Sequence, residues 1–258
     1  MCRLLGVVSE RRAPLSELLA DEFEPFLELA CEHADGWGLS YINPSGIVVT
    51  RKEPVPAHKS TVLPELMDQV VTDAAILHLR MASPDLPVTI SNTHPFGDTK
   101  YAFAHNGAFA PADLLDQWTG LRASAAGGET DSERYYLAVR GRIDEGAVPA
   151  AAIANTAADI RALTTEWESL NCLLLSRQAL YAYADPNPRS KVLGRRGPGF
   201  FDLEYQAKPD RLVVASTGWA RPTGNWQQLP GRQVLEVQRG LRMTLHTEGY
   251  GKANAKLS

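Results

Sequence analysis

Two groups of strand-like segments flank a central pair of helices, and this order constrains the fold more than any other feature of the sequence. Helical spacing of apolar residues predicts the central pair at 130–143 and 147–164 and two earlier helices at 15–34 and 60–71. Strand-like patterns occupy 4–8, 39–53, 74–81, 101–105, 172–185, 211–219, 232–240 and 241–248. Most neighbouring strands can pair through short turns, which favours antiparallel sheets. We therefore predict an α+β protein in which helices pack on two sheets.

Composition excludes several classes of protein. The chain has 258 residues, of which 44% are hydrophobic and 22% charged, as in an ordinary globular protein. The net charge of −4 provides no basic surface, so we expect no nucleic-acid partner. Apolar runs such as AFAPADLL are too short to span a bilayer, and the N-terminus lacks the apolar core of a signal peptide. The sequence thus predicts a cytoplasmic protein with no membrane partner.

Motifs for nucleotides, metals and disulfides are missing from the sequence. Neither GxGxxG nor GxxxxGK[ST] occurs, which disfavours the common nucleotide-dependent enzymes. Cys2, Cys31 and Cys172 form an odd set without the spacing of a zinc site or a disulfide framework. We therefore expect no cofactor and no metal, and we interpret Cys31 and Cys172 as small buried hydrophobic residues.

The first residues, MCRLLGVV, place a cysteine directly behind the initiator methionine. Removal of Met1 would leave a residue that carries both a thiol and a free α-amino group. Such an amine has a reference pKa near 8 and can accept the thiol proton directly or through a water, as it does for N-terminal threonine nucleophiles. Cys2 is therefore a candidate nucleophile, provided that Met1 is removed.

Four short polar stretches add to this candidate: HLRMAS, NTHPF, HNG and ETDSE. Each has a common structural use when it is taken singly. HNG can be a hairpin turn, and TDSE can cap a helix. Together they offer a different chemistry, because Asn106 and Gly107 can donate hydrogen bonds to an oxyanion. Arg80 is suited to a carboxylate, and Asp131 to an ammonium group. This set fits a site that recognises a glutamyl group.

In combination, MCRLLGVV, DGWGLSY, HLRMAS, NTHPF, FAHNGAF and GETDSE resemble the class II glutamine amidotransferase domain of the N-terminal nucleophile (Ntn) hydrolases. The stretches follow the family's order, and the strands after 172 resemble those that complete the domain. The resemblance implies a four-layer αββα sandwich of two antiparallel sheets in a single domain over residues 2–258. The chain is most similar to the short stand-alone members, such as the ergothioneine-pathway γ-glutamyl hydrolases.

The resemblance also implies a role for each matched residue. Cys2 corresponds to the nucleophile, with its own α-amino group as the base, and Asn106 and Gly107 correspond to the oxyanion hole. Arg80 matches the arginine that binds the substrate α-carboxylate. Asp131 matches the group that binds the α-ammonium, with help from the Gly107 carbonyl.

Two further positions match the family with less defined roles. Ser83 falls where larger relatives carry a threonine near the substrate carboxylate. His94 corresponds to a histidine of the short members and is expected to support the pocket. The resemblance thus adds both residues to the predicted substrate-binding site.

Three functions remain open from the sequence. The protein can hydrolyse a γ-glutamyl amide through a γ-glutamyl thioester, releasing glutamate and an amine or ammonia. It can instead be a glutaminase subunit that delivers ammonia to a partner synthase, or an inactive binding module on an Ntn-like scaffold. The amine half of a substrate would contact loops around 84–87 and 193–201, and the Gly-, Pro- and Arg-rich segment 186–200 is either a solvated loop or a basic lid over a charged leaving group.

Overall fold

The computed structural model describes residues 1–83, 86–116 and 126–247 of the chain. Strands in this part of the chain form a seven-stranded sheet in the order β11-β9-β10-β1-β4-β2-β3 and a six-stranded sheet in the order β13-β12-β8-β7-β6-β5. All pairings between these strands are antiparallel. The predicted α+β fold with two antiparallel sheets is confirmed.

The strands of the first sheet are β1 (Arg3–Pro14), β2 (Trp37–Ile42), β3 (Val48–Glu53), β4 (Val71–Leu79), β9 (Leu203–Ala207), β10 (Arg211–Ser216) and β11 (Gln227–Gln228). Those of the second are β5 (Phe96–Gly97), β6 (Tyr101–Phe109), β7 (Trp167–Ser176), β8 (Ala179–Tyr183), β12 (Gln233–Gln238) and β13 (Met243–Thr247). The helices are α1 (Leu15–Leu18), α2 (Phe23–Leu27), α3 (Val62–Gln69), α5 (Asp131–Asp144), α6 (Pro149–Leu163) and α7 (Lys191–Arg196), with 3₁₀ turns at η1 (Glu28–Cys31), η2 (Ala57–Lys59) and η3 (Ala112–Leu115).

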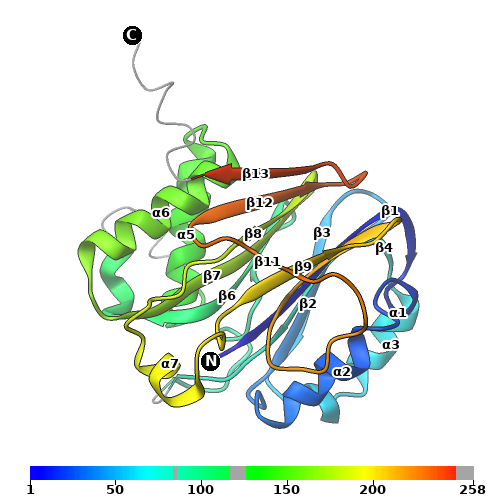
Figure 1. Ribbon diagram of the computed structural model, residues 1–258, viewed down its shortest axis with the longest axis horizontal. Coiled ribbons are helices and arrows are strands. Elements are labelled where there is room, and N and C mark those ends of the chain that lie inside the picture. The colour runs from blue at the N-terminus through cyan, green and yellow to red at the C-terminus, as the bar shows by residue number, and fades with distance from the viewer. Residues whose placement is uncertain (84–85, 117–125, 248–258) are drawn as a thin grey trace.

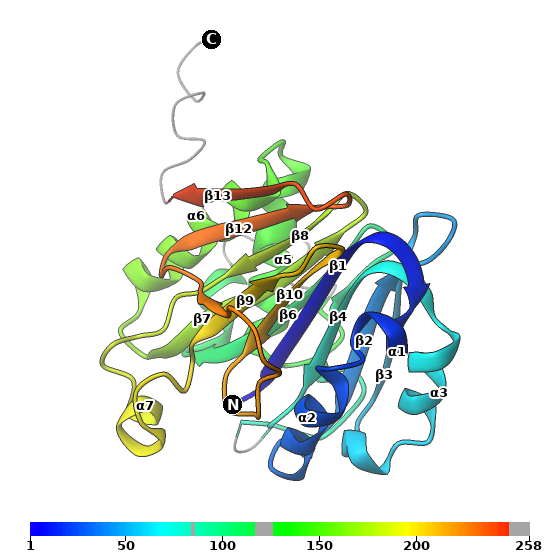
Figure 2. The same cartoon turned by 45° about the vertical axis from the view of Figure 1, so that its right-hand side comes forward.

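Helices cover the outer face of each sheet, which gives the four layers αββα (Figures 1 and 2). α1, α2 and α3 pack on the first sheet, and α5 and α6 pack on the second. Along β1, Leu5 and Val7 face the helices, whereas Leu4 and Val8 face the other sheet. This alternation follows from the two-residue period of a strand, and it explains why β1 is buried on both faces.

The helix predicted over 15–34 is wrong as a single element. The segment instead divides into α1, α2 and η1, with turns between Leu19 and Glu22. Pro25 explains the interruption, because its ring lacks an N–H and clashes with the carbonyl four residues earlier. The segment still buries its apolar residues against the first sheet, as the helical spacing indicated. The prediction that Cys31 is buried is also wrong, whereas Cys172 is buried in β7.

Two predictions that rest on local turn and cap signals agree with the structure, and one does not. The predicted hairpin at 39–53 is β2 and β3, whose turn is closed by an N–H from Ile47 to the Asn43 side chain at 2.9 Å. The predicted cap of α5 is also present, since Thr130 Oγ1 accepts from the Glu133 N–H at 3.1 Å. HNG is not a turn, because β6 continues through it to Phe109.

Two expectations lie partly or wholly beyond this description. A single domain over 2–258 stays a prediction, since residues 248–258 lie outside the described residues. Residues 84 and 85, in the loop predicted to contact the leaving amine, also lie outside the described residues. No helix among the described residues combines the length and the apolar composition that crossing a membrane requires.

Candidate active site

The site forms at one end of the sandwich, where β1 begins and β4 ends. In the register of these strands Leu4 lies opposite His78. The two-residue period of a strand therefore places Cys2 and Arg80 on the same face as this pair, toward the second sheet. β6 of the second sheet contributes Asn106 and Gly107 across the layer.

Six of the seven predicted site residues line one cavity of about 540 Å³. They are Cys2, Arg80, Ser83, His94, Gly107 and Asp131. Asn106 is fully buried beside the cavity but does not line it. The structure thus brings together side chains that lie up to 129 positions apart in the sequence, between Cys2 and Asp131.

The Cys2 side chain is largely shielded from solvent. Cys2 is 7% exposed, and its Sγ donates a long hydrogen bond to the Met81 carbonyl at 3.7 Å. Burial raises the pKa of the thiol, while the N-terminal amine and Arg80 act in the opposite direction. Burial also lowers the pKa of the Met1 amine, with a smaller effect in the same direction from Arg3 and Arg196. Burial thus acts against the charged form of both the amine and the thiol.

Arg80 and Asp131 give the cavity two unpaired opposite charges. Arg80 is 2% exposed, and within the described residues its guanidinium donates to the Asp35 and Pro87 carbonyls alone, both at 3.3 Å. Asp131 is 9% exposed and accepts from the Phe109 N–H at 2.9 Å. Neither charge forms a salt bridge within the described parts of the chain. Because unpaired buried charges are costly, both are suited to charged groups of a ligand.

A hydrogen-bond network holds Asp131 in place. The His105 ring lies 3.0 Å from the Ser169 carbonyl through Nε2 and 2.9 Å from Ser132 Oγ through Nδ1. A carbonyl only accepts, so Nε2 carries the proton, and Nδ1 of the neutral ring accepts from the Ser132 hydroxyl. Asp131 Oδ1 is then held by the Ser132 N–H at 2.8 Å. Burial lowers the pKa of His105, which keeps this neutral form. His105 therefore joins β6, β7 and the start of α5, a role that the HNG motif did not reveal.

Asn106 and Gly107 are constrained by the antiparallel pairing of β6 with β7. Both polar atoms of the Asn106 side chain are buried without a hydrogen-bond partner. At Gly107 a Cβ would lie 1.7 Å from the Ser169 carbonyl oxygen, so only glycine fits. An unpartnered buried amide beside a backbone that approaches closely is suited to hydrogen bonding with a ligand oxygen.

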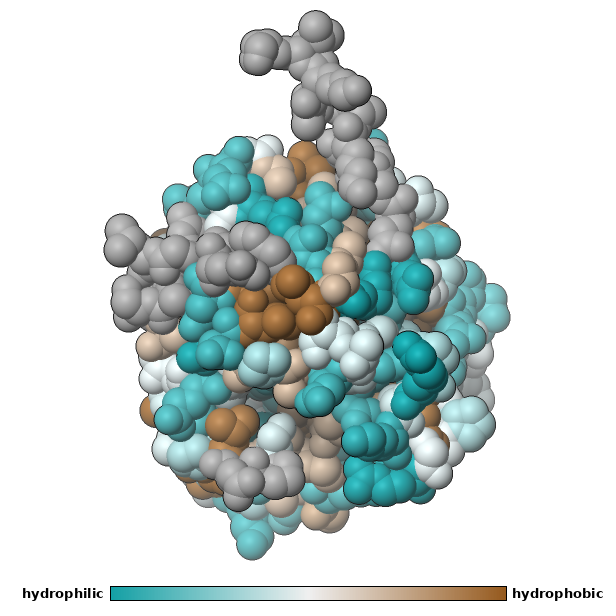
Figure 3. Space-filling model, turned by 90° about the vertical axis from the view of Figure 1, so that its left-hand side faces the viewer, coloured by the Kyte–Doolittle hydropathy of each residue, from teal (hydrophilic) through white to brown (hydrophobic). Residues whose placement is uncertain are grey.

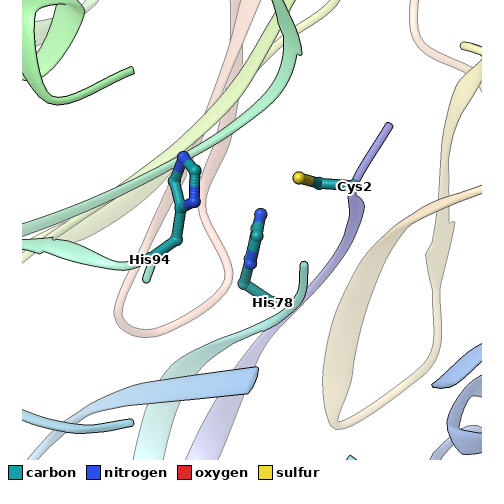
Figure 4. Close-up of side chains that lie close together, drawn as sticks. All are labelled: Cys2, His78 and His94. Atoms are coloured by element: carbon teal, nitrogen blue, oxygen red, sulfur yellow. The ribbon is translucent and has the colours of Figure 1, made fainter. Parts of the chain in front are cut away.

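The two histidines near the thiol stack on one another. The rings of His78 and His94 lie 4.1 Å apart at an angle of 26°, and in Figure 4 the Cys2 thiol points toward them. Gly38 permits this placement, because a Cβ there would lie 2.0 Å from the His94 carbonyl oxygen. Burial holds the pKa of both histidines well below the usual range. His78 was not among the predicted site residues, although HLRMAS contains it.

The segment 186–200 also reaches the cavity, through α7 and the residues that follow α7 in the sequence. Val192, Arg195, Arg196 and Phe200 line the wall. Ser190 caps α7 by accepting from the Val192 N–H at 3.0 Å. The prediction that part of 193–201 contacts the site agrees with this placement, while its role as a lid stays untested.

The family model of the class-II glutamine amidotransferases matches residues 1–249. The chain therefore belongs to this family and is an amidohydrolase. The predicted resemblance is confirmed.

The sequence of the chain is similar to those of curated hydrolases. It is 24% identical over 263 residues to the γ-glutamyl-hercynylcysteine sulfoxide hydrolase of Mycobacterium tuberculosis, covering 95% of this chain and 96% of the relative. The protein of the same name from Mycolicibacterium smegmatis is 24% identical over 216 residues, covering 80% and 78%.

Solved structures agree on the fold. A glutamine aminotransferase class-II domain protein from Silicibacter pomeroyi has a TM-score of 0.65 at 17% identity, covering 96% of this chain and all of the other. The glutamine phosphoribosylpyrophosphate amidotransferase of B. subtilis has a TM-score of 0.66 at 18% identity, and the match spans 97% of this chain but 50% of that one. These structures support the Ntn-type αββα fold.

Proposed function

We propose that the protein hydrolyses a γ-glutamyl amide of a metabolite through a γ-glutamyl thioester on Cys2. The observation that carries the proposal is the pair of unpaired buried charges, Arg80 and Asp131, on the wall that also holds the Cys2 thiol. A glutamyl group carries an α-carboxylate and an α-ammonium, which match these two charges in sign. An inactive binding module would have no use for the thiol, whereas a glutaminase subunit would use the thiol and both charges as well.

The proposed reaction requires removal of Met1. The free amine of Cys2 takes the thiol proton, and the thiolate attacks the γ-carbonyl carbon. Asn106 Nδ2 and the Gly107 N–H stabilise the oxyanion. The C–N bond then breaks, and the departing amine takes the proton. Water hydrolyses the thioester to glutamate, which restores the thiol.

Free-standing hydrolysis is favoured over delivery of ammonia to a synthase. The M. tuberculosis relative, which the chain matches over 96% of its length, is named as a hydrolase. On the face shown in Figure 3, the described residues place apolar groups in small patches between hydrophilic ones.

The test of the proposal is an assay of the purified protein alone. The protein should carry no Met1 by intact mass and should release glutamate from at least one member of a panel of γ-glutamyl amides. Acceleration of about tenfold or more by a co-purifying synthase, or about 1.4 kcal/mol, would instead support the ammonia-delivery function. Absence of turnover on the whole panel would support the binding module.

Arg80→Lys and Asp131→Asn are each expected to lower kcat/KM by at least about tenfold, or about 1.4 kcal/mol. Lysine loses the bidentate geometry of arginine, and asparagine loses the charge that balances an ammonium group. Steady-state kinetics on the best γ-glutamyl amide measures the effect. The exposed residues Arg51 and Asp68 provide matched controls as Arg51→Lys and Asp68→Asn. Normal efficiency of both site variants would contradict the assignment of the glutamyl pocket.

Arg195 gives the outer half of the cavity a free positive charge. Arg196 is paired with Glu32 at 2.6 Å, and Glu168 accepts from Ser190 and from the Val192 N–H at the start of α7. Arg195 forms no ion pair with any residue of the described ranges. We therefore expect the leaving amine to carry an anionic group.

Arg195→Gln should lower kcat/KM about threefold to fivefold for γ-glutamylglycine, whose leaving amine carries a carboxylate, and leave glutamine unaffected. The effect is small because Arg195 is exposed, and exposed ion pairs contribute about 1 kcal/mol or less. Arg189→Gln, at an exposed position outside the cavity, is the control. An equal loss on both substrates would show that Arg195 does not select the leaving group.

A further inference from the structure

Three side chains from separate parts of the chain meet at the wall of the cavity, which Cys2 and His94 line. Cys2 precedes β1, His78 lies on β4, and His94 lies in the loop before β5. One potential ligand atom of each, the thiol sulfur and one ring nitrogen per histidine, lies within 4.8 Å of the others. Figure 4 shows the two rings side by side, with the Cys2 thiol pointing toward them.

The histidine nitrogens in this cluster lack partners. Both ring nitrogens of His94 and Nδ1 of His78 are buried without a hydrogen bond. His78 Nε2 has only a long contact of 3.4 Å to the His105 carbonyl. Buried polar atoms without a partner are rare because each costs about 1–3 kcal/mol. The cluster therefore holds unused electron-pair donors beside a thiol.

We propose that Cys2, His78 and His94 form a binding site for a borderline-soft divalent cation of the Zn²⁺ type. Thiolate sulfur and neutral imidazole nitrogen are the ligands that such cations prefer. Once Met1 is removed, the α-amino group of Cys2 supplies a fourth donor, which forms a five-membered chelate with the sulfur of the same residue. Binding breaks the S–H bond, forms a metal–sulfur bond and releases one proton to solvent, with no change of oxidation state.

The site must contract, and one ring must turn, to reach metal geometry. Zn–N and Zn–S bonds of about 2.0 and 2.3 Å place tetrahedral ligand atoms about 3.3–3.7 Å apart. The three ligand atoms lie within 4.8 Å of one another, so the widest separation must shrink by about 1 Å. The His78 and His94 rings stack at 26°, so one ring must also rotate before both nitrogen lone pairs point to one ion. Arg80 opposes a cation here and Asp131 favours it, since both charges act on the Cys2 sulfur.

A bound cation would occupy the proposed nucleophile. Metal binding and attack on a γ-glutamyl carbonyl use the same sulfur electron pair, so the two exclude one another. The metal would thus be a reversible inhibitor, and a chelator would restore turnover. This consequence rests on the proposed function, whereas metal binding itself does not.

Titration of the full-length, Met1-free protein with Co²⁺ tests the site. We expect one Co²⁺ per chain with a thiolate-to-cobalt charge-transfer band, and displacement by one equivalent of Zn²⁺. Cys2→Ser should lose the band. His78→Asn and His94→Asn should each weaken binding by at least about tenfold, whereas His58→Asn, at an exposed position, should not.

A second measurement covers the case in which a histidine variant fails to fold. Stoichiometric Zn²⁺ should protect Cys2 of the unaltered protein from iodoacetamide, as read by peptide mass, and Cys31 should stay reactive as an internal reference. Absence of 1:1 Co²⁺ binding, a band that persists in Cys2→Ser, or unchanged affinity in both folded histidine variants would overturn the proposal. These readouts do not depend on turnover, so they separate failure of the metal site from failure of the proposed hydrolysis.

Discussion

Cys2→Ala is expected to abolish hydrolysis of γ-glutamyl amides, with a fall in kcat of about 10⁴-fold or more. The variant lacks the atom that forms the thioester, and the cavity offers no second thiol in the described residues that line it. Cys2→Ser should be severely impaired as well, because a hydroxyl is a far weaker nucleophile at neutral pH. Glutamate release by the purified variants measures both effects.

Folding should survive these substitutions. Cys2 is small, lies before the first strand, and makes one long hydrogen bond of 3.7 Å to Met81. Alanine removes a single buried atom, at a cost of about 1 kcal/mol. Cys31→Ala, at an exposed thiol, is the matched control and should keep full activity. Turnover of Cys2→Ala at the rate of the unaltered protein would exclude the proposed mechanism.

Elements with local signals were predictable. The turn at Asn43 and the cap at Thr130 are each encoded within a few residues, and both occur in the structure. The sequence did not predict α7, because a residue distant in the sequence helps to stabilise this helix. Its capping residue Ser190 donates to Glu168, which lies 22 positions earlier in β7. The surrounding Gly-, Pro- and Arg-rich composition resembles a loop.

The candidate site was predictable where a motif carried several candidate site residues at once. HLRMAS contains Arg80 and Ser83, and HNG contains Asn106 and Gly107, so the family resemblance identified them without knowledge of strand register. The proximity of His78 to Cys2 depends instead on the pairing of β1 with β4. His94 joins them only because Gly38 permits a close crossing of the chain. Such contacts between distant segments leave no pattern in a single sequence.

Acid is expected to destabilise the protein through His33, by about 3 kcal/mol between pH 7 and pH 4. His33 is fully buried, and burial, with a smaller effect from Arg3, lowers its pKa from 6.5 to about 4. In the unfolded chain the same imidazole binds a proton near pH 6.5. Below that pH the unfolded state binds more protons, so the free energy of unfolding falls as pH falls from 6.5 to about 4.

Urea denaturation at pH 7, 6, 5 and 4 measures this loss, and His33→Gln isolates the contribution of one imidazole. Glutamine can keep a hydrogen bond to the Leu29 carbonyl, which lies 2.8 Å from His33 Nδ1, but it does not titrate. Between pH 7 and pH 5 the variant should therefore lose about 2 kcal/mol less than the unaltered protein. His58→Gln, at an exposed histidine, should follow the unaltered protein throughout. Equal slopes for His33→Gln and the unaltered protein would mean that His33 titrates alike in the folded and unfolded states, which contradicts its burial beside Arg3.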